Sequence, residues 1–160
     1  MNIEEISTQR LKRVKLRTTR HRVRVLSVLE LAQRPLTHLE ILQSIPEQNL
    51  DRVTLYRILA SLTEASLVHQ IQGFDGTWRF CSHDDETDKC PGGHPHLLCS
   101  SCGMMWCMPE VKLQHIDVPE GFQVTHKQMV IVGVCKECQS SPRPRVCSPN
   151  SQENAHNTSN

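Results

Sequence analysis

The stretch that decides the fold runs from Asp51 to Ser82 and reads DRVTLYRILASLTEASLVHQIQGFDGTWRFCS. Asp51 is a good helix cap, because its carboxylate can accept hydrogen bonds from the first backbone N–H groups of a helix. Apolar residues then recur at helical spacing and predict one buried face, made of Leu55, Ile58, Leu59 and Leu62. The opposite face carries Val53, Tyr56, Arg57 and Ala60. The stretch therefore predicts an amphipathic helix that presents an aromatic and a cationic side chain to a partner.

Two strands are predicted directly after this helix, over residues 67–72 and 77–82, with the hairpin signal Phe74-Asp-Gly76 between them. Three further helices are predicted upstream. They are residues 3–15, a segment capped by Thr18 or Thr19, and a short helix that opens with the capping box Thr37-His-Leu-Glu40 and stops before Pro46. Helices followed by a hairpin are the pattern of a winged helix-turn-helix domain.

The rest of the chain predicts a smaller second domain. Strands are expected near 96–99, 104–107 and 122–135, with a short helix around 110–115. The predicted fold class is α/β (α+β), with four segments: a winged-helix DNA-binding domain over 1–82, a polar hinge loop over 83–93, a small α/β metal-binding domain over 94–139 and a disordered Ser-, Pro- and Asn-rich tail over 140–160.

The net charge of +1 over 160 residues conceals an asymmetry. Residues 1–60 carry 11 Lys/Arg against 6 Asp/Glu, whereas residues 61–140 carry 5 against 10. A basic first half predicts a polyanionic partner, and a solvated helix face is the alternative. No apolar run is long enough for a membrane helix, and the first residues do not resemble a signal peptide. A cytoplasmic protein without a membrane segment is expected, in which the 8 cysteines stay reduced.

The strongest motif is a pair of Cys-x-x-Cys knuckles, Cys99-Ser-Ser-Cys102 and Cys135-Lys-Glu-Cys138. Four thiolates at this spacing can surround one Zn²⁺ tetrahedrally, so the motif predicts a structural zinc site. A pair of redox dithiols is the alternative.

A looser group of metal ligands is expected around the hinge. His94 and His96 alternate along an extended chain, so they point to the same side. His69, Cys81 and Cys107 add an imidazole and two thiols from other predicted strands. Their convergence predicts a second metal site, and nitrogen with sulfur ligands favours zinc over iron(II) or manganese. Isolated core histidines and a packed thiol are the alternative.

Two stretches supply candidate DNA contacts. Arg57 is long enough to reach a guanine edge in the major groove, and Tyr56 can contact a thymine methyl or pack on the wing. Arginines of the basic stretch can neutralise phosphates or enter the minor groove. The candidates are Arg17, Thr18, Arg20, Arg22, Arg52, Thr54, Tyr56 and Arg57. The chain has no nucleophile elbow, P-loop or dinucleotide motif, so neither an enzyme nor a small-molecule substrate is expected.

Together these motifs resemble the ferric uptake regulator (Fur) family of bacterial metal-sensing repressors. The likeness rests on Leu-Arg-Thr18-Thr-Arg-His-Arg22, Val-Thr54-Leu-Tyr56-Arg57, Leu-Val-His69 and His94-Pro-His96-Leu-Leu-Cys99-Ser-Ser-Cys102-Gly103. It implies a winged-helix domain, a hinge and an α/β dimerisation domain, in homodimers that bind palindromic operators when metal-loaded. In this likeness Tyr56 and Arg57 contact bases, and Arg17 enters the minor groove.

Within the family the chain looks like the zinc uptake regulator (Zur) branch, which often has a cysteine where Cys81 stands. The resemblance implies a regulatory site of His69, Cys81, His94 and His96. Cys107 replaces a glutamate common in the family, and is a ligand, an alternative ligand or a packed thiol. The dimerisation helix looks truncated, because few residues separate Met108 from Phe122 and two of them are prolines.

The expected function is a zinc-responsive repressor of zinc uptake genes, with a structural and a regulatory zinc in each subunit of the homodimer. One alternative is a repressor of the same family that senses iron or peroxide. The other is a zinc-stapled adaptor or thiol redox protein that does not bind DNA.

Overall fold

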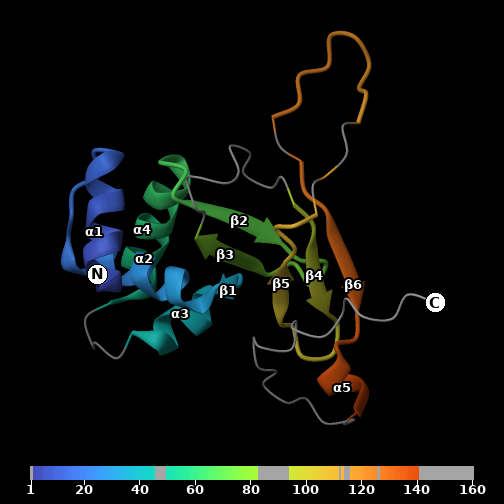
Figure 1. The fold of residues 1–160 in the computed structure, drawn as a ribbon, viewed down its shortest axis with the longest axis horizontal. Coiled ribbons are helices and arrows are strands. Elements are labelled where there is room, and N and C mark those ends of the chain that lie inside the picture. Colours follow the sequence, from blue (N-terminus) through green and yellow to red (C-terminus); the bar gives the residue numbers. More distant parts are fainter. Residues whose placement is uncertain are drawn as a thin grey trace.

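The computed structural model describes residues 2–45, 50–82, 94–111, 113, 116–125 and 127–140 (Figure 1). We call the described part of 2–82 the N-terminal lobe and the described part of 94–140 the C-terminal lobe. The first holds four helices, α1 (Ile3–Arg13), α2 (Arg20–Ala32), α3 (His38–Ser44) and α4 (Arg52–Glu64), beside a small sheet. The second is built on another sheet, with one short helix after its last strand. The predicted fold class is confirmed.

Side-chain caps set where the helices begin. Thr19, one of the two threonines expected to do so, accepts a hydrogen bond from the backbone N–H of Arg22 at the start of α2. Thr37 and Glu40 form the expected capping box of α3. Asp51 accepts the N–H of Thr54 at 2.8 Å and opens α4. These short-range hydrogen bonds satisfy donors that the helices leave unpaired, which is why the sequence predicts them well.

Helix α4 buries the face that its periodicity predicts. The residues of this face contribute to one core with apolar residues of α1, α2 and α3, and they are Leu55, Ile58, Leu59 and Leu62. Those predicted to point outward are exposed, namely Val53, Tyr56, Arg57 and Ala60. The helix is thus fixed by its inner face, and its outer face remains accessible.

The wing is the hairpin of β2 (Val68–Gln72) and β3 (Trp78–Ser82). A short strand β1 (Leu36–Thr37), which the sequence analysis did not predict, pairs with β3 and gives a sheet of order β1-β3-β2. The hairpin turn needs a left-handed backbone at Gly76, whose φ is +72°. His69 lies directly opposite Cys81 in this register.

The C-terminal lobe is a three-stranded sheet of β4 (His96–Cys99), β5 (Met105–Cys107) and β6 (Val130–Gly133), followed by α5 (Lys136–Ser140). Its order is β5-β4-β6, so β6 forms an edge. β4 pairs antiparallel with β5 and parallel with β6.

Three expectations for this lobe need correction. The strand expected over 122–135 is confined to Val130–Gly133, because β4 offers only four residues for pairing. Glu110 and Val111 lie in a turn and a bend, not in the expected helix; residues 112, 114 and 115 fall outside the described part. Ser140 ends α5, a helix the sequence analysis missed, and does not open the tail; 141–160 are likewise outside it.

Side chains join the two lobes directly. Arg79 of β3 is 3% exposed and donates hydrogen bonds to the carboxylate of Asp75 and, at 2.7 Å, to the carbonyl of Gly103. Gln128 bonds through its amide to both the N–H and the C=O of Gln72 in β2. A buried polar group such as the Arg79 guanidinium must keep its partners, so its bond to Gly103 favours a closed arrangement of the lobes, and the exposed Gln128–Gln72 pair adds a second link. The expected hinge, 83–93, lies outside the described residues, and the domain boundaries remain a proposal.

Among the described residues, none of the helices combines the length and the apolarity that crossing a membrane requires.

Candidate metal centres and nucleic-acid interface

The two Cys-x-x-Cys knuckles come together at one end of the C-terminal sheet. Cys99 ends β4 and Cys102 lies in the following turn, while Cys135 immediately precedes α5 and Cys138 lies within it. Their sulfur atoms are all within 4.8 Å of one another. Four sulfurs at the Zn–S bond length of a tetrahedral site lie about 3.8 Å apart, so the group fits one zinc ion.

Backbone N–H groups stabilise the negative charge that a cation would meet in this cluster. The N–H of Cys135 donates to the sulfur of Cys99 at 3.3 Å. Burial raises the pKa of Cys99, but hydrogen bonds from backbone N–H groups of Cys135, Cys102 and Ser101 outweigh it and lower the pKa to about 6. A thiolate is the form that binds metal, so the turn stabilises the required charge state.

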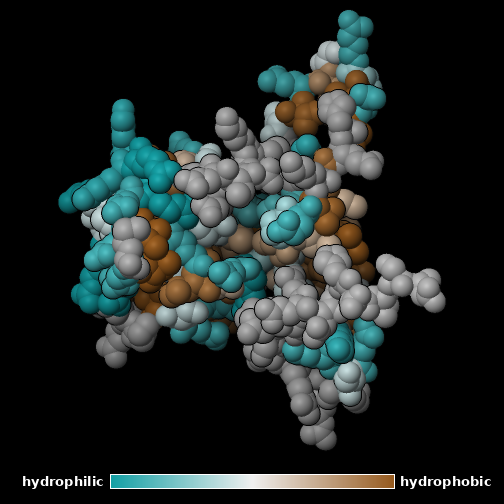
Figure 2. Space-filling model, viewed as in Figure 1, coloured by the Kyte–Doolittle hydropathy of each residue, from teal (hydrophilic) through white to brown (hydrophobic). Residues whose placement is uncertain are grey.

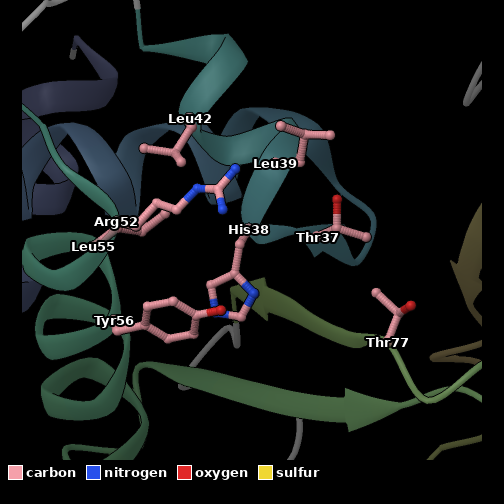
Figure 3. A pocket seen from close by; sticks show the side chains of 8 residues that line it. All are labelled: Thr37, His38, Leu39, Leu42, Arg52, Leu55, Tyr56 and Thr77. Carbon is pink, nitrogen blue, oxygen red and sulfur yellow. The ribbon is translucent and has the colours of Figure 1, made fainter.

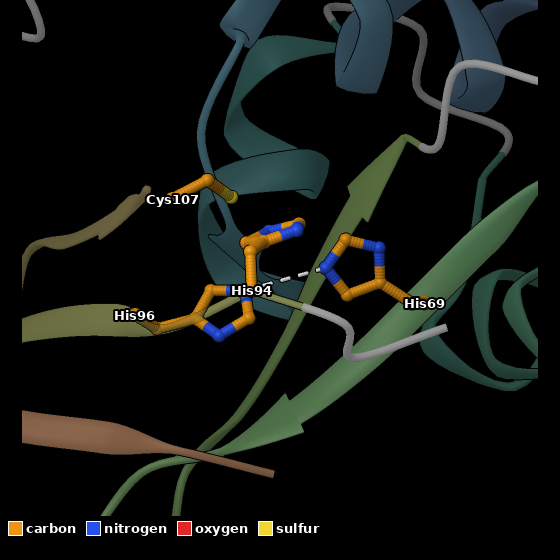
Figure 4. A group of neighbouring side chains, drawn as sticks. All are labelled: His69, His94, His96 and Cys107. Carbon is orange, nitrogen blue, oxygen red and sulfur yellow. Dashed lines mark hydrogen bonds between the residues drawn. The ribbon is translucent and has the colours of Figure 1, made fainter. Parts of the chain in front are cut away.

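A second cluster bridges the lobes and consists of His69, His94, His96 and Cys107 (Figure 4). His69 comes from β2 of the wing, His96 from β4 and Cys107 from β5, whereas His94 precedes β4. The ligand atoms of the four residues lie within 4.8 Å of one another, and the three histidines are buried. We call this group the hinge cluster. The structure thus brings together residues that the sequence analysis could associate only loosely.

The geometry and charge of the hinge cluster suit a tetrahedral metal. The Nε2 atoms of His69 and His96 are 3.4 Å apart, and two nitrogens of a tetrahedral zinc site are about 3.3 Å apart. Burial, with a smaller effect from the charge of His94, lowers the pKa of His96 to about 4. His96 is therefore neutral at pH 7, which is the form that coordinates a metal. Its Nδ1 is buried, and no described group hydrogen-bonds to it.

Cys81 lies beside this cluster and outside the four-donor group. Its sulfur is 3.5 Å from the sulfur of Cys107. The hydrogen bond with Cys81, then burial and the charge of Cys81, raise the pKa of Cys107. The structure thus groups Cys107 with the three histidines, and places Cys81, the sulfur ligand that the family resemblance implies, in contact with it. None of the six described cysteines is in a disulfide.

The exposed face of α4 is the candidate nucleic-acid interface. Arg52, Tyr56 and Arg57 are exposed there, with Tyr56 at 53%. The ring of His38, at the start of α3, lies 4.1 Å from the ring of Tyr56, centroid to centroid. A pocket of about 410 Å³ opens between α3, α4 and Thr77 of the wing turn, and His38, Arg52 and Tyr56 are on its wall (Figure 3).

The basic stretch before α2 adds to this interface. Arg17, Thr18 and Arg20 are exposed. Arg22 and Thr54, which are both among the predicted contacts, have hydrogen-bond partners within the chain. Arg22 donates to the carbonyl of Arg17, and the hydroxyl of Thr54 donates to the cap residue Asp51 at 2.7 Å. Their first role in the structure is therefore to shape the backbone around the exposed arginines.

Sequence reasoning missed three residues that position these sites. His38 supports Tyr56, Arg79 joins the wing to the turn of the first knuckle, and Gln128 joins the second lobe to β2. Asp75, four residues before Arg79 and at the hairpin turn, was a weak signal of a wing ion pair. No signal in the sequence marked Gly103 or Gln72 as the distant partners.

Hydrophobic side chains are also exposed on the C-terminal lobe, and Figure 2 shows them gathered over the β6 side of the molecule. Those of β6 and the preceding segment are Ile116, Val118, Phe122, Val124, Met129, Ile131 and Val132. Because β6 is an edge strand, apolar exposure and unpaired backbone groups coincide there.

Comparisons with known proteins agree on one family. The peroxide-responsive repressor PerR of Staphylococcus aureus is 29% identical over 141 residues, which cover 84% of this chain and 90% of that protein. The ferric uptake regulator Fur of Helicobacter pylori has a similar fold, with TM-score 0.58, 23% identity, and 86% and 91% of the two chains covered. A zinc uptake regulator complexed with zinc and DNA also has a similar fold, with TM-score 0.62 and 18% identity. The match covers 88% of this chain and 97% of that chain.

The family model described as "Ferric uptake regulator family" matches residues 13–137. Proteins of this family are dimeric, metal-dependent DNA-binding regulators of transcription and not enzymes. The matched region includes the hinge cluster, the first three cysteines of the Cys-x-x-Cys cluster and the candidate DNA-binding helix. Because it spans well over half of the sequence, the chain belongs to the ferric uptake regulator family.

Proposed function

We propose that this protein is a zinc-responsive member of its family, a homodimeric repressor of zinc uptake genes that binds a palindromic operator when the hinge cluster holds zinc. The observation that carries the proposal is the composition of that cluster. Three imidazoles and one thiol converge from the two lobes, with their ligand atoms within 4.8 Å of one another and one nitrogen pair 3.4 Å apart. A metal ion held there is shared between the wing and the second lobe.

The donor set supports zinc as the metal. Among the residues that the structure describes, the cluster offers nitrogen and sulfur, with the second sulfur of Cys81 adjacent, and no carboxylate. Iron(II) and manganese(II) prefer more oxygen ligands. With the Cys-x-x-Cys cluster, the proposal gives two zinc ions per subunit, one structural and one regulatory. The similar fold of a zinc uptake regulator solved with zinc and DNA is consistent with it.

The residues of the hinge cluster would couple metal binding to DNA binding through the position of the wing. His69 moves with the wing, while His94, His96 and Cys107 belong to the second lobe. When bound, zinc supplies a tetrahedral cross-link between them. The closed arrangement, already supported by Arg79 and Gln128, is then favoured by the difference in zinc affinity between the closed and open states.

The direct test measures zinc content and operator binding together. We expect two zinc ions per subunit, and one after mild chelation has removed the hinge zinc. Operator affinity should fall when the hinge zinc is lost. Fluorescence anisotropy with a labelled operator, in Zn²⁺, Fe²⁺ or Mn²⁺, identifies the effective metal. Tight binding with iron alone would refute the zinc assignment.

A second candidate is a repressor that senses peroxide or iron, favoured by the 29% identity to the PerR proteins of Staphylococcus aureus. The metal series above separates the two, because this candidate requires an iron-dependent complex with the operator. The sulfur donor of the hinge cluster, Cys107, weighs against it.

Replacing Arg57 by alanine tests the proposed interface. A bidentate arginine–guanine contact is worth about 1–3 kcal/mol, so we expect operator affinity to fall about tenfold to a hundredfold and discrimination at one base pair to relax. The matched control is Lys127→Ala, which removes an exposed charge from the other lobe. If the Arg57 variant keeps its affinity and its salt dependence, α4 is not the recognition helix.

The exposed edge of the second sheet supports the proposed homodimer. Ile131 is 45% exposed on β6, and pairing of two β6 edges about a two-fold axis would cover it. We expect Ile131→Lys to be a monomer of 18.3 kDa, because a charge on an edge strand opposes pairing. Light scattering after gel filtration measures the mass. Leu31→Lys, on α2 and 66% exposed in the wild type, should remain a dimer; if both variants dimerise, the β6 edge is not the interface.

A further inference from the structure

We propose that Cys81 and Cys107 form a dithiol that hydrogen peroxide oxidises to a disulfide, and that this disulfide and hinge-bound zinc exclude one another. The inference rests on the proposed zinc site and gives that site a second, oxidative input. Its basis is the thiol pair of this chain, which bridges the two lobes beside the hinge cluster.

The two thiols come from different lobes and lie in contact with each other. Cys81 is on β3 of the wing and Cys107 on β5 of the second lobe, and their sulfurs are 3.5 Å apart. Each faces a hinge histidine across its own strand pair, Cys81 opposite His69 and Cys107 opposite His96. The pair thus sits at the contact between the lobes.

The sulfurs need only a small approach to bond. A disulfide is about 2.05 Å long, so they must close a gap of about 1.5 Å, which is within the range of a side-chain rotation. Cys107 is partly exposed, which gives a small oxidant access to the pair.

The oxidation balances with hydrogen peroxide as the only co-reactant. One sulfur, as thiolate, attacks a peroxide oxygen; the O–O bond breaks, a sulfenic acid forms and, with one proton, water leaves. The second thiol then attacks the sulfenic sulfur, which forms the S–S bond and releases a second water. In total two thiols and one peroxide give one disulfide and two waters, and the sulfurs lose two electrons to the peroxide.

Zinc and the disulfide compete for the same sulfur. A disulfide sulfur is not the thiolate that zinc requires, so oxidation removes Cys107 from the four-donor group and leaves three imidazoles. Conversely, a thiolate bound to zinc is a poor nucleophile toward peroxide. Zinc-loaded protein should therefore resist oxidation, and oxidised protein should lose hinge zinc and regain it after reduction.

The experiment uses the full chain with its Cys-x-x-Cys zinc retained and the hinge zinc removed by mild chelation. Hydrogen peroxide should lower the mass by two hydrogen atoms. Trypsin cuts after Arg79 and Lys89, so Cys81 is the only cysteine of its peptide. Cyanogen bromide cuts after Met105 and Met108, so Cys107 is the only cysteine of its peptide. We expect these two peptides to be linked, and dithiothreitol to separate them.

Cys81→Ala is the matched variant, because it retains Cys107 for the hinge cluster and removes the partner thiol. It should form no such link. After peroxide treatment of the two chelated proteins, added zinc should bring Cys81→Ala back to two zinc ions per subunit, while the oxidised wild type should stay at one until it is reduced. A disulfide between other cysteines, or equal oxidation with and without hinge zinc, overturns the inference. If the reduced wild type never binds a second zinc, the proposed zinc site fails, and the linked peptides still report on the thiol pair separately.

Discussion

Replacing Cys99 by serine is expected to abolish the folding of the C-terminal lobe. Cys99 and Cys138 are buried in a small cluster with Met104 and Trp106, and little other apolar core supports this end of the sheet. Structural zinc sites contribute about 10–16 kcal/mol to folding, whereas a whole domain is stable by about 5–15 kcal/mol. The folding free energy lost with one of the four sulfurs is therefore larger than the remaining contacts of the lobe can offset.

The two tryptophans allow the loss to be assigned to one lobe. Trp106 is 8% exposed on β5, and Trp78 is on the wing. In a Trp78→Phe background, Trp106 alone should report a solvent-exposed ring in Cys99→Ser, with no cooperative thermal transition. Cys107→Ser is the control, because it keeps the four knuckle cysteines and should retain one zinc and the native emission. A Cys99→Ser protein that still holds that zinc and melts cooperatively would contradict a structural role for the cluster.

The sequence predicted best what short stretches of chain determine. The caps Thr37 and Asp51 and the buried face of α4 follow from neighbouring residues, so a local pattern is enough. The Cys-x-x-Cys cluster was also predictable, because two such turns have few ways to satisfy four sulfurs other than one metal.

The contacts between distant segments could not be predicted in the same way. The length of β6 is limited by β4, and Arg79 finds its partner at Gly103 in the other lobe. Which cysteine joins the three histidines depends on the register of β4 with β5, and this register places Cys107 opposite His96. Such pairings depend on tertiary packing, and no spacing in one sequence specifies them.

The second large effect is expected for His96→Phe, which should fold and dimerise but lose its response to zinc. His96 is 1% exposed, so an aromatic ring of similar size preserves packing that alanine would leave as a cavity. Its Nε2 atom, 3.4 Å from that of His69, is removed, and a four-ligand site with one ligand missing cannot close between the lobes. We expect hinge zinc affinity to fall at least about a hundredfold while the Cys-x-x-Cys zinc remains.

Linkage sharpens this test, because the effects of zinc on DNA binding and of DNA on zinc binding must be equal. Couplings of this kind are typically about 1–3 kcal/mol, or about 5-fold to 150-fold. In the wild type, operator DNA should tighten hinge zinc by the factor by which zinc tightens the operator. In His96→Phe both factors should approach one, whereas in Leu97→Phe, the neighbouring position of β4, both should persist. Isothermal titration of zinc with and without operator measures one factor and anisotropy the other. If zinc still raises operator affinity in His96→Phe by the wild-type factor, the hinge cluster is not the sensor, since its ligands would then carry no part of the coupling.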